Sequence, residues 1–178
     1  MLRIFIAGLL GGVAMYIWSS IAHVATPLGT AGVSTLPNES VTVDNLASSI
    51  GNKGGLFLFP MNANASASAA TAPGGFLVYN PKSPTSMQPS NLIVEFATEL
   101  VEAILAAWLL AQTALAGYLP RVGFVTVVGA IGAIVTNVPY WNWYAFPLTY
   151  TLTQIFVTVV AFLVAGLAIA AYLKPRTA

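Results

Sequence analysis

Long apolar runs constrain the fold of this chain more than any other feature. A helix that crosses a bilayer needs about 20 predominantly apolar residues. Four stretches approach or exceed that length, namely residues 1–25, 91–118, 122–138 and 148–173. The sequence therefore predicts an all-α membrane protein built as a four-transmembrane-helix bundle, forming a single membrane domain. The third run is close to the lower limit of roughly 17 residues, so we expect it to lie near the membrane normal.

The charge content supports placement in lipid. Of the 178 residues, 57% are hydrophobic and only 6% are charged, whereas an average soluble domain has roughly 25% charged residues. Six basic and five acidic side chains cannot cover the surface of a soluble globule of this length. The expected partner is therefore the lipid bilayer, and the formal net charge of +1 argues against a nucleic-acid partner. The absence of cysteine excludes disulfides and thiolate metal sites.

The distribution of basic residues predicts the orientation. Four basic residues fall on one side of the four runs: Arg3, Arg121, Lys174 and Arg176. Only Lys53 and Lys82 fall on the other side, within the long connection 26–90. Because basic residues near helix ends stay in the cytoplasm, both termini are predicted to be cytoplasmic, in a bacterial inner membrane.

The first run also has features of a secretory signal peptide. Arg3 precedes an apolar stretch, and a small-residue site ends at Ala22, so that cleavage before His23 is an alternative. We expect this segment to be a retained membrane anchor.

The connection 26–90 is predicted to form a small extracytoplasmic cap, and we use "cap" for this segment throughout. Structureless loops longer than about 15 residues are uncommon in compact proteins. Residues 43–50 have apolar side chains at helical spacing and end at Gly51, which predicts a short helix. The runs 56–59 and 76–79 are bounded by glycine and proline and predict a β-hairpin.

Three glutamates form one column on the second apolar run. Steps of about 100° per residue place Glu99 about 40° and Glu102 about 20° from Glu95, on opposite sides of it. The column extends about 10 Å along the helix axis. A carboxylate at that depth needs a partner, a proton or water, so we expect the surrounding protein to supply a polar environment.

The other apolar runs are polar at the same depth, which predicts a cavity open to the extracytoplasmic side and roofed by the cap. The first run carries Tyr16, Ser20 and His23 at helical spacing. The expected lining residues of the cavity, besides the histidine and the glutamates, are Tyr16, Ser20, Asn137, Tyr150 and Gln154.

Small residues four positions apart predict tight helix packing. Such spacing lets helix backbones approach closely in lipid. The pairs are Gly8 and Gly12, Gly129 and Ala133, and Gly166 and Ala170.

Several functions are compatible with this cavity. Carboxylates and an imidazole are acceptable ligands for a divalent metal ion, which makes His23, Glu95, Glu99 and Glu102 candidate metal ligands; a small polar ligand is the other possible occupant. Alternatively, the chain is an accessory or structural subunit of a larger bacterial membrane complex or a homo-oligomer, with the glutamates facing a membrane-protein partner. A third interpretation is a hydrated helix at the outer interface. No catalytic motif is present, so an enzyme is the least favoured class.

Two segments carry a resemblance to a known family. The stretch HVATPLGTAGVSTLPNES, followed by GLFLFP, and the stretch VPYWNWYAFP are similar to a family of small uncharacterised bacterial integral membrane proteins. That resemblance implies four transmembrane helices and a long first extracytoplasmic loop. It implies no activity, and it does not include the three glutamates.

Overall fold

The computed structural model describes residues 1–60, 73–82 and 87–174. The elements in chain order are α1 (Leu2–Ser20), α2 (Glu39–Ile50), β1 (Gly55–Phe59), β2 (Gly75–Tyr79), α3 (Pro89–Ala111), α4 (Tyr118–Tyr144) and α5 (Leu148–Tyr172). Between α1 and α2 lie a π-helical turn, Ile21–Ala25, and a 3-10 turn, Pro27–Thr30. The low-complexity stretch 62–70, which the sequence predicts to be loosely packed, lies outside the described residues.

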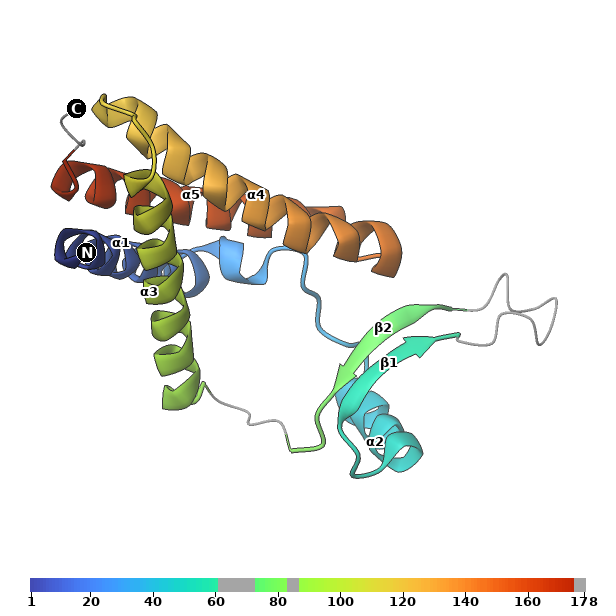
Figure 1. The fold of residues 1–178 in the computed structure, drawn as a ribbon. Coiled ribbons are helices and arrows are strands. Elements are labelled where there is room, and N and C mark those ends of the chain that lie inside the picture. Colours follow the sequence, from blue (N-terminus) through green and yellow to red (C-terminus); the bar gives the residue numbers. More distant parts are fainter. Residues whose placement is uncertain (61–72, 83–86, 175–178) are drawn as a thin grey trace.

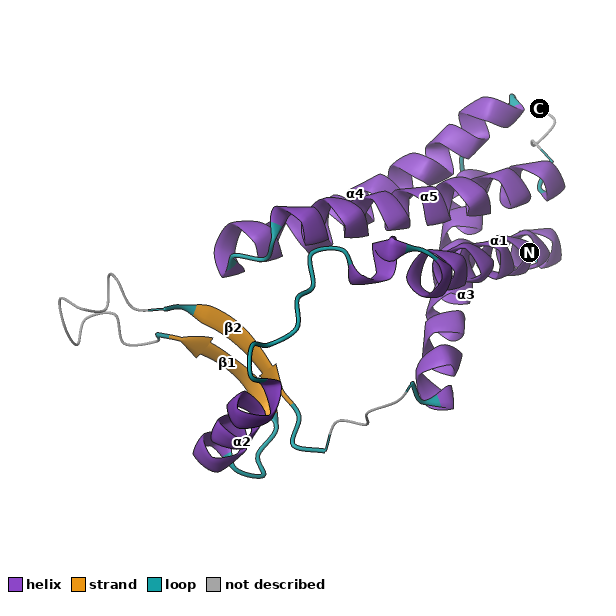
Figure 2. Ribbon diagram, turned by 180° about the vertical axis from the view of Figure 1, so that it is seen from behind, coloured by secondary structure: helices purple, strands orange, loops and turns teal. Residues whose placement is uncertain are grey.

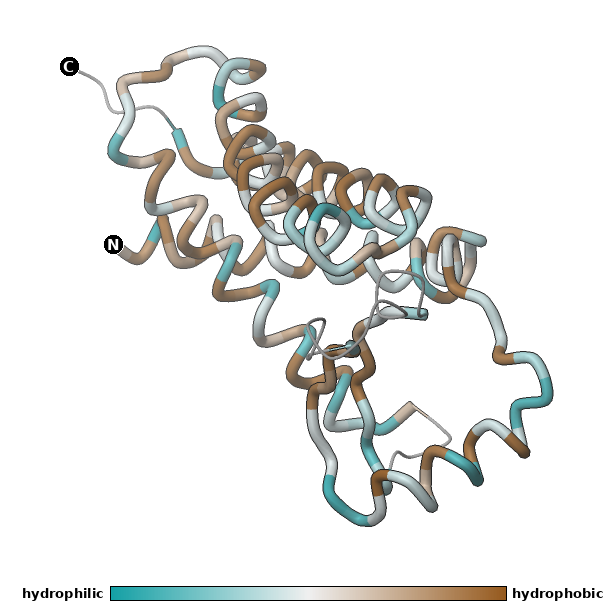
Figure 3. Tube along the Cα trace, turned by 90° about the vertical axis from the view of Figure 1, so that its right-hand side faces the viewer, coloured by the Kyte–Doolittle hydropathy of each residue, from teal (hydrophilic) through white to brown (hydrophobic). Residues whose placement is uncertain are grey.

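The long helices form the body of the molecule. Helix α4 packs along α5, and α1 packs against both α3 and α5. Figure 1 shows α4 and α5 side by side, α3 crossing the other helices steeply, and the start of α1 at the same end of the molecule as the end of α5. In Figure 3 these helices are predominantly hydrophobic along their length.

Three helical segments are long and apolar enough to cross a membrane. They are Leu2–Ala25, Tyr118–Tyr144 and Leu148–Tyr172, and they correspond to the first, third and fourth predicted spans. Helix α3 has 23 residues but carries three glutamates, which keeps it out of this group. The membrane character predicted from composition is confirmed to this extent.

Close helix packing at glycine confirms the predicted small-residue contacts. A Cβ atom on Gly8 would lie 2.5 Å from Ile104 Cα, and one on Gly12 would lie 2.8 Å from Leu100 Cα. Gly129 lies directly against the Phe162 side chain. These are distances that only glycine permits, so the crossing of α1 over α3 depends on glycine in α1.

The boundaries of two helices differ from the prediction. Helix α3 ends at Ala111 and not near residue 118. Beyond this end, the Thr113 hydroxyl donates to the Leu110 carbonyl oxygen at 2.8 Å, a local bond that competes with helical geometry. Helix α4 continues through Pro139 to Tyr144. A proline removes only one backbone hydrogen bond, a loss that membrane helices tolerate, so the predicted helix end near Pro139 is wrong.

The end of α4 is instead set by Ala145. This residue adopts a left-handed conformation with φ of 56°. The Phe146 amide then donates to the Tyr140 carbonyl oxygen at 3.3 Å, which is the bond that closes many helix C-termini. The aromatic stretch before Phe146 is therefore helical.

The cap contains the predicted short helix and hairpin. Helix α2 ends at Gly51, whose φ of 73° suits glycine, and β1 pairs antiparallel with β2. Phe76 of β2 stacks on Tyr144 of α4 with ring centroids 4.7 Å apart. Figures 1 and 2 show the hairpin near the end of α4, with α2 beside the hairpin on the side away from α4.

Candidate ligand-binding cavity

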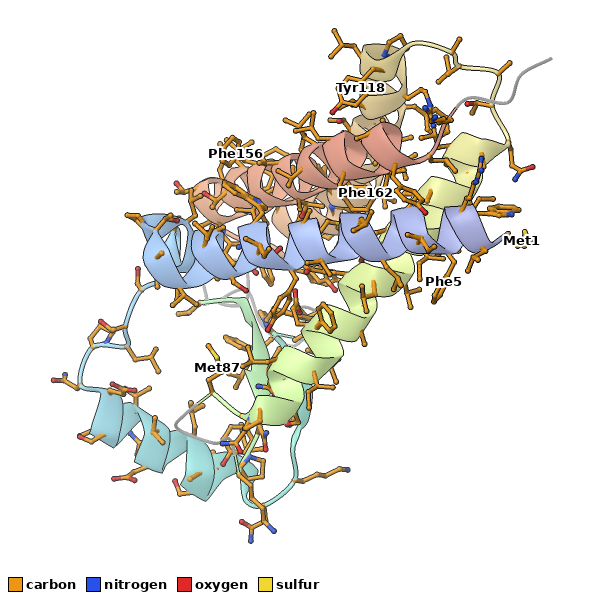
Figure 4. All side chains as sticks on the ribbon, turned by 90° about the vertical axis from the view of Figure 1, so that its left-hand side faces the viewer. Met1, Phe5, Met87, Tyr118, Phe156 and Phe162 are labelled. Atoms are coloured by element: carbon orange, nitrogen blue, oxygen red, sulfur yellow. The ribbon has the colours of Figure 1, made fainter. Side chains whose placement is uncertain are left out.

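The steep crossing of α1 and α3 creates the site. The two helices touch where Gly8 and Gly12 meet Ile104 and Leu100, and they diverge on either side of that contact (Figure 4). Small residues at the contact point let two membrane helices approach this closely. Glu99 lies at the contact, since a Cβ on Gly12 would lie 3.2 Å from its carbonyl oxygen. Helix α5 also packs against α1 and completes the walls of the cavity.

A cavity of about 220 Å³ lies between these three helices. It is lined from α1 and its π-helical extension by Met15, Ser19 and His23, from α3 by Glu95, Thr98, Glu99 and Glu102, and from α5 by Gln154, Val157, Thr158, Ala161 and Phe162. We call this the acidic cavity. None of the described cap residues lines it, so its walls come from the helices and not from the cap that was predicted to roof it.

Glu99 is the most deeply buried acidic group of the cavity. Its side chain is 5% exposed, whereas Glu95 is exposed and Glu102 is half-buried. The carboxyl of Glu99 interacts with the Ser19 hydroxyl, and its Oε2 atom has no hydrogen-bond partner within the described part of the chain. A buried carboxyl oxygen without a partner is unfavourable, so Glu99 provides an unfilled acceptor inside the cavity.

His23 stands at the exposed edge of the cavity. Its Nδ1 donates to the Ser19 carbonyl oxygen at 2.9 Å, a bond that fixes the ring orientation and leaves Nε2 available. The residue lies in the π-helical turn Ile21–Ala25, and such turns occur frequently at functional sites. The Thr26 hydroxyl closes this turn by donating to the Ala22 carbonyl oxygen at 2.7 Å.

The electrostatic character of the cavity is negative. Three carboxyl groups line it, and no lysine or arginine of the described chain is among the lining residues. The Thr98 hydroxyl uses its proton on the Val94 carbonyl oxygen at 2.9 Å, so only its lone pairs remain for a ligand. Acceptors therefore predominate, and the complementary ligand is a cation or a hydrogen-bond donor.

A second, mostly apolar cavity of about 480 Å³ adjoins the first. The two share Glu102, Thr158 and Phe162. The remaining walls come from α3 and α4 and comprise Leu105, Ala106, Leu109, Val128, Gly132, Ala133, Thr136 and Asn137. Glu102 thus stands between an acidic space and an apolar one.

The structure brings together five of the nine residues predicted for the site. The acidic cavity contains His23, Glu95, Glu99, Glu102 and Gln154. Asn137 lines the adjoining apolar cavity, where its amide donates to the Ala133 carbonyl oxygen at 2.9 Å.

The other three predicted residues lie elsewhere. Tyr16 packs edge-on against Phe96 with centroids 5.1 Å apart, and Tyr150 packs beside Phe146 with centroids 5.6 Å apart. Ser20 is half-buried and lines neither cavity.

Three polar residues of the acidic cavity were not predicted, namely Ser19, Thr98 and Thr158. The sequence prediction placed Tyr16 on the side of the first helix that lines the cavity. The buried residues of α1 lie one position away, because Met15 and not Tyr16 is buried. The buried residues include Gly8, Gly12, Met15 and Ser19. Two signals in the sequence point toward Ser19, namely the glycine pair on the same side of the helix and the four-residue spacing of Ser19 from His23.

The described residues contain no group of three or more histidine, cysteine, aspartate or glutamate side chains placed to hold a metal ion. The four predicted ligands share a cavity without forming a metal-ligand cluster. A directly coordinated divalent ion stays a prediction of the sequence, and the geometry favours a ligand held by hydrogen bonds and charge.

Comparison with known proteins identifies no relative: no family model, no curated protein and no solved structure matches the chain. The resemblance drawn from the sequence therefore stays a prediction. Function has to be inferred from the geometry of the cavity.

Proposed function

We propose that this protein binds a small organic cation, such as a primary ammonium group, in the acidic cavity. The observation that carries the proposal is the buried Oε2 atom of Glu99, which lines the cavity without a hydrogen-bond partner in the described part of the chain. An ammonium group offers three donors. Its three donors can be shared between Glu99 and the neighbouring Glu102, and its single positive charge offsets one of the two carboxylate charges.

The adjoining apolar cavity favours a cation with an apolar body. Because Glu102 lines both spaces, an ammonium group bound there places its alkyl substituent among Leu105, Leu109 and Val128. Binding sites commonly combine apolar walls with a few polar groups that fix the orientation of the ligand. A bare divalent ion makes no use of the apolar space.

We further propose that α3 crosses the membrane as the fourth span and that the acidic cavity opens on the extracytoplasmic side of a bacterial inner membrane. Arg3 at the start of α1, Thr113 after α3 and Lys174 after α5 all line one pocket at the same end of the bundle. This arrangement supports an antiparallel path in which α3 returns to the end where α1 begins. The basic residues at that end support cytoplasmic termini.

The test is isothermal titration calorimetry of the purified full-length chain in detergent. The probes are butylammonium, methylammonium and manganese chloride. We expect saturable binding of butylammonium, a loss of at least about tenfold in affinity for Glu99→Gln because one charge-assisted hydrogen bond is worth roughly 1.5–3 kcal/mol, and no effect of Glu39→Gln. Glu39 lies on the exposed α2, so Glu39→Gln changes the charge by the same amount at a position outside the cavity and serves as the control.

Each outcome of the titration decides between alternatives. Binding of manganese alone, abolished by Glu99→Gln, replaces the organic cation by a metal ion. Identical heats for the wild type and Glu99→Gln with every probe reject the cavity as a cation site. Circular dichroism on each variant shows that the helices are intact.

A second candidate, an accessory subunit of a larger membrane complex, is favoured by the amino-terminal half of α3. Leu92, Ile93 and Val94 are 43%, 67% and 65% exposed, and α3 packs mainly against α1. Native mass spectrometry from mild detergent tests this function. A stable assembly with another protein or another copy supports it, and free monomer at every detergent concentration counts against it.

A further inference from the structure

A second site lies at the opposite end of the bundle, where α1 begins and α5 ends. A pocket of about 370 Å³ is lined by Met1, Arg3, Ile4, Leu110, Ala111, Thr113, Leu115, Arg121, Leu173 and Lys174. We call this the basic pocket. It draws three cationic side chains from three different helix ends, and no acidic residue among those described lines it.

Arg121 distinguishes this pocket from the basic residues that commonly flank membrane helices. Basic residues that only fix membrane orientation extend their charged groups into water. Arg121 is instead 4% exposed, and its Nη1 donates to the Ala170 carbonyl oxygen at 3.4 Å. Tyr118 makes a parallel bond to the Leu167 carbonyl oxygen at 3.1 Å. The carboxyl end of α5 thus holds the guanidinium in place at the pocket wall.

The guanidinium has capacity left for a ligand. It carries five N–H donors, and a single hydrogen bond is made within the described residues. None of its nitrogen atoms is both fully buried and unpartnered in the described part of the chain, so each nitrogen without a partner keeps some exposed surface, and Arg121 is among the residues that line the pocket. A planar donor fork matches the oxygens of a phosphate group, and Arg3 and Lys174 add two further positive charges.

An apolar groove continues from the basic pocket between α1 and α3. The groove has a volume of about 670 Å³ and is lined by Met1, Leu2, Ile4, Phe5, Ile104, Leu105 and Trp108. Met1 and Ile4 line both spaces. Figure 4 shows both Met1 and Phe5 at the start of α1. The basic pocket and the apolar groove therefore share one wall.

We propose that the basic pocket and the apolar groove together bind one anionic phospholipid, with its phosphate at Arg121, Arg3 and Lys174 and an acyl chain along the groove. Free phosphate accounts for the basic pocket alone and leaves the groove unexplained. Basic pockets between membrane helices on the cytoplasmic side are suited to anionic headgroups.

The experiment is native mass spectrometry of the full-length chain, released from micelles with dioleoylphosphatidylglycerol or with dioleoylphosphatidylcholine. We expect retained adducts of the anionic lipid at about a hundredfold lower lipid concentration than of the zwitterionic lipid, since each of the three basic side chains near the headgroup contributes about fivefold. Arg121→Gln keeps a donor for the Ala170 carbonyl oxygen but removes the charge, and it should abolish most of this preference. Lys174→Gln, at an exposed position, should reduce the preference by about fivefold.

Lys53→Gln is the matched control, because Lys53 is an exposed basic residue in the cap. Equal retention of both lipids by the wild type, or an equal loss of preference in Lys53→Gln, overturns the proposal. So does an unchanged preference in both Arg121→Gln and Lys174→Gln.

Two further arms separate a lipid from free phosphate. Dihexanoylphosphatidylglycerol has the same headgroup without a long chain, and Trp108→Ala should weaken the dioleoyl lipid while leaving the short-chain lipid unaffected. Inorganic phosphate, titrated calorimetrically, should bind weakly or not at all. Tight binding of inorganic phosphate, together with no effect of Trp108→Ala on the dioleoyl lipid, shows a phosphate site and refutes the lipid site.

Discussion

The indole nitrogen of Trp18 lies 3.0 Å from the backbone carbonyl oxygen of Val157 and donates a hydrogen bond to it. Val157 lines the acidic cavity, and Ser19 follows Trp18 directly in the chain. This one bond therefore joins α1 to α5 beside the site and fixes the position from which Ser19 reaches Glu99. Trp18, which does not itself line the cavity, therefore stabilises the cavity wall.

Trp18→Phe should destabilise the protein modestly. The substitution removes the indole donor while keeping most of the ring, so we expect a loss of about 1 kcal/mol in the free energy of unfolding. Chemical denaturation in mixed micelles measures this. Trp143→Phe, at an exposed ring on the end of α4, should leave the free energy of unfolding unchanged. If the two variants unfold alike, the bond to Val157 does not contribute.

Gly8→Ala should separate α1 from α3. The added methyl would lie 2.5 Å from Ile104 Cα, an atom of the backbone that cannot move aside independently. Overpacking of this kind costs typically 1–3 kcal/mol. The matched control is Gly123→Ala, because a Cβ there meets no described atom within 4 Å. Thermal unfolding should show a lowered midpoint for Gly8→Ala only, and a lowered midpoint for both variants would count against this packing.

Phe76→Ala should loosen the attachment of the hairpin to the bundle. The ring of Phe76 stacks on Tyr144 and lies 6.3 Å from the ring of Phe146, and an aromatic pair contributes about 0.5–1.5 kcal/mol beyond its buried area. Hydrogen exchange at the β2 amides should become faster. Val78→Ala changes an exposed side chain of the same strand and should leave the rates unchanged. Slow exchange in both variants would mean that other contacts hold the hairpin.

Gly132→Leu tests whether the apolar cavity accommodates part of the ligand. Gly132 lines that cavity, and a Cβ there meets no atom of the described residues within 4 Å, so a leucine can fill the space without displacing the backbone. We expect butylammonium affinity to fall toward that of methylammonium, because each buried methylene contributes about 0.8 kcal/mol. Calorimetric titration of both amines measures the difference. An unchanged difference between the amines in Gly132→Leu would place the alkyl chain elsewhere.

The sequence predicted which segments form helices and strands better than it predicted which side of a helix lines the cavity. Apolar length identified three spans, and Gly51 correctly ended the cap helix, because these properties depend on local residues. The face of α1 that lines the cavity depends on where Gly8 meets Ile104, which is a contact between distant parts of the chain. The glutamate column was placed in a polar site from its spacing, yet only the structure distinguishes buried Glu99 from exposed Glu95.

The path of α3 across the membrane can be decided by labelling, because the chain contains no cysteine and every introduced thiol is unique. Lys82 and Lys174 are both exposed, so Lys82→Cys and Lys174→Cys report the cap and the end of α5. If α3 crosses the membrane, the chain passes through four times and these two positions lie on opposite sides. A membrane-impermeant maleimide applied to intact spheroplasts should then label Lys82→Cys, and should label Lys174→Cys only after the membrane is opened. If α3 does not cross, three spans carry the end of α5 to the same side as the cap, and both cysteines react in intact spheroplasts.

Leu119→Cys, at an exposed position at the start of α4, checks the same alternative independently. With four spans this cysteine lies on the cytoplasmic side and does not react with the maleimide in intact spheroplasts. With three spans it lies on the side of the cap and reacts.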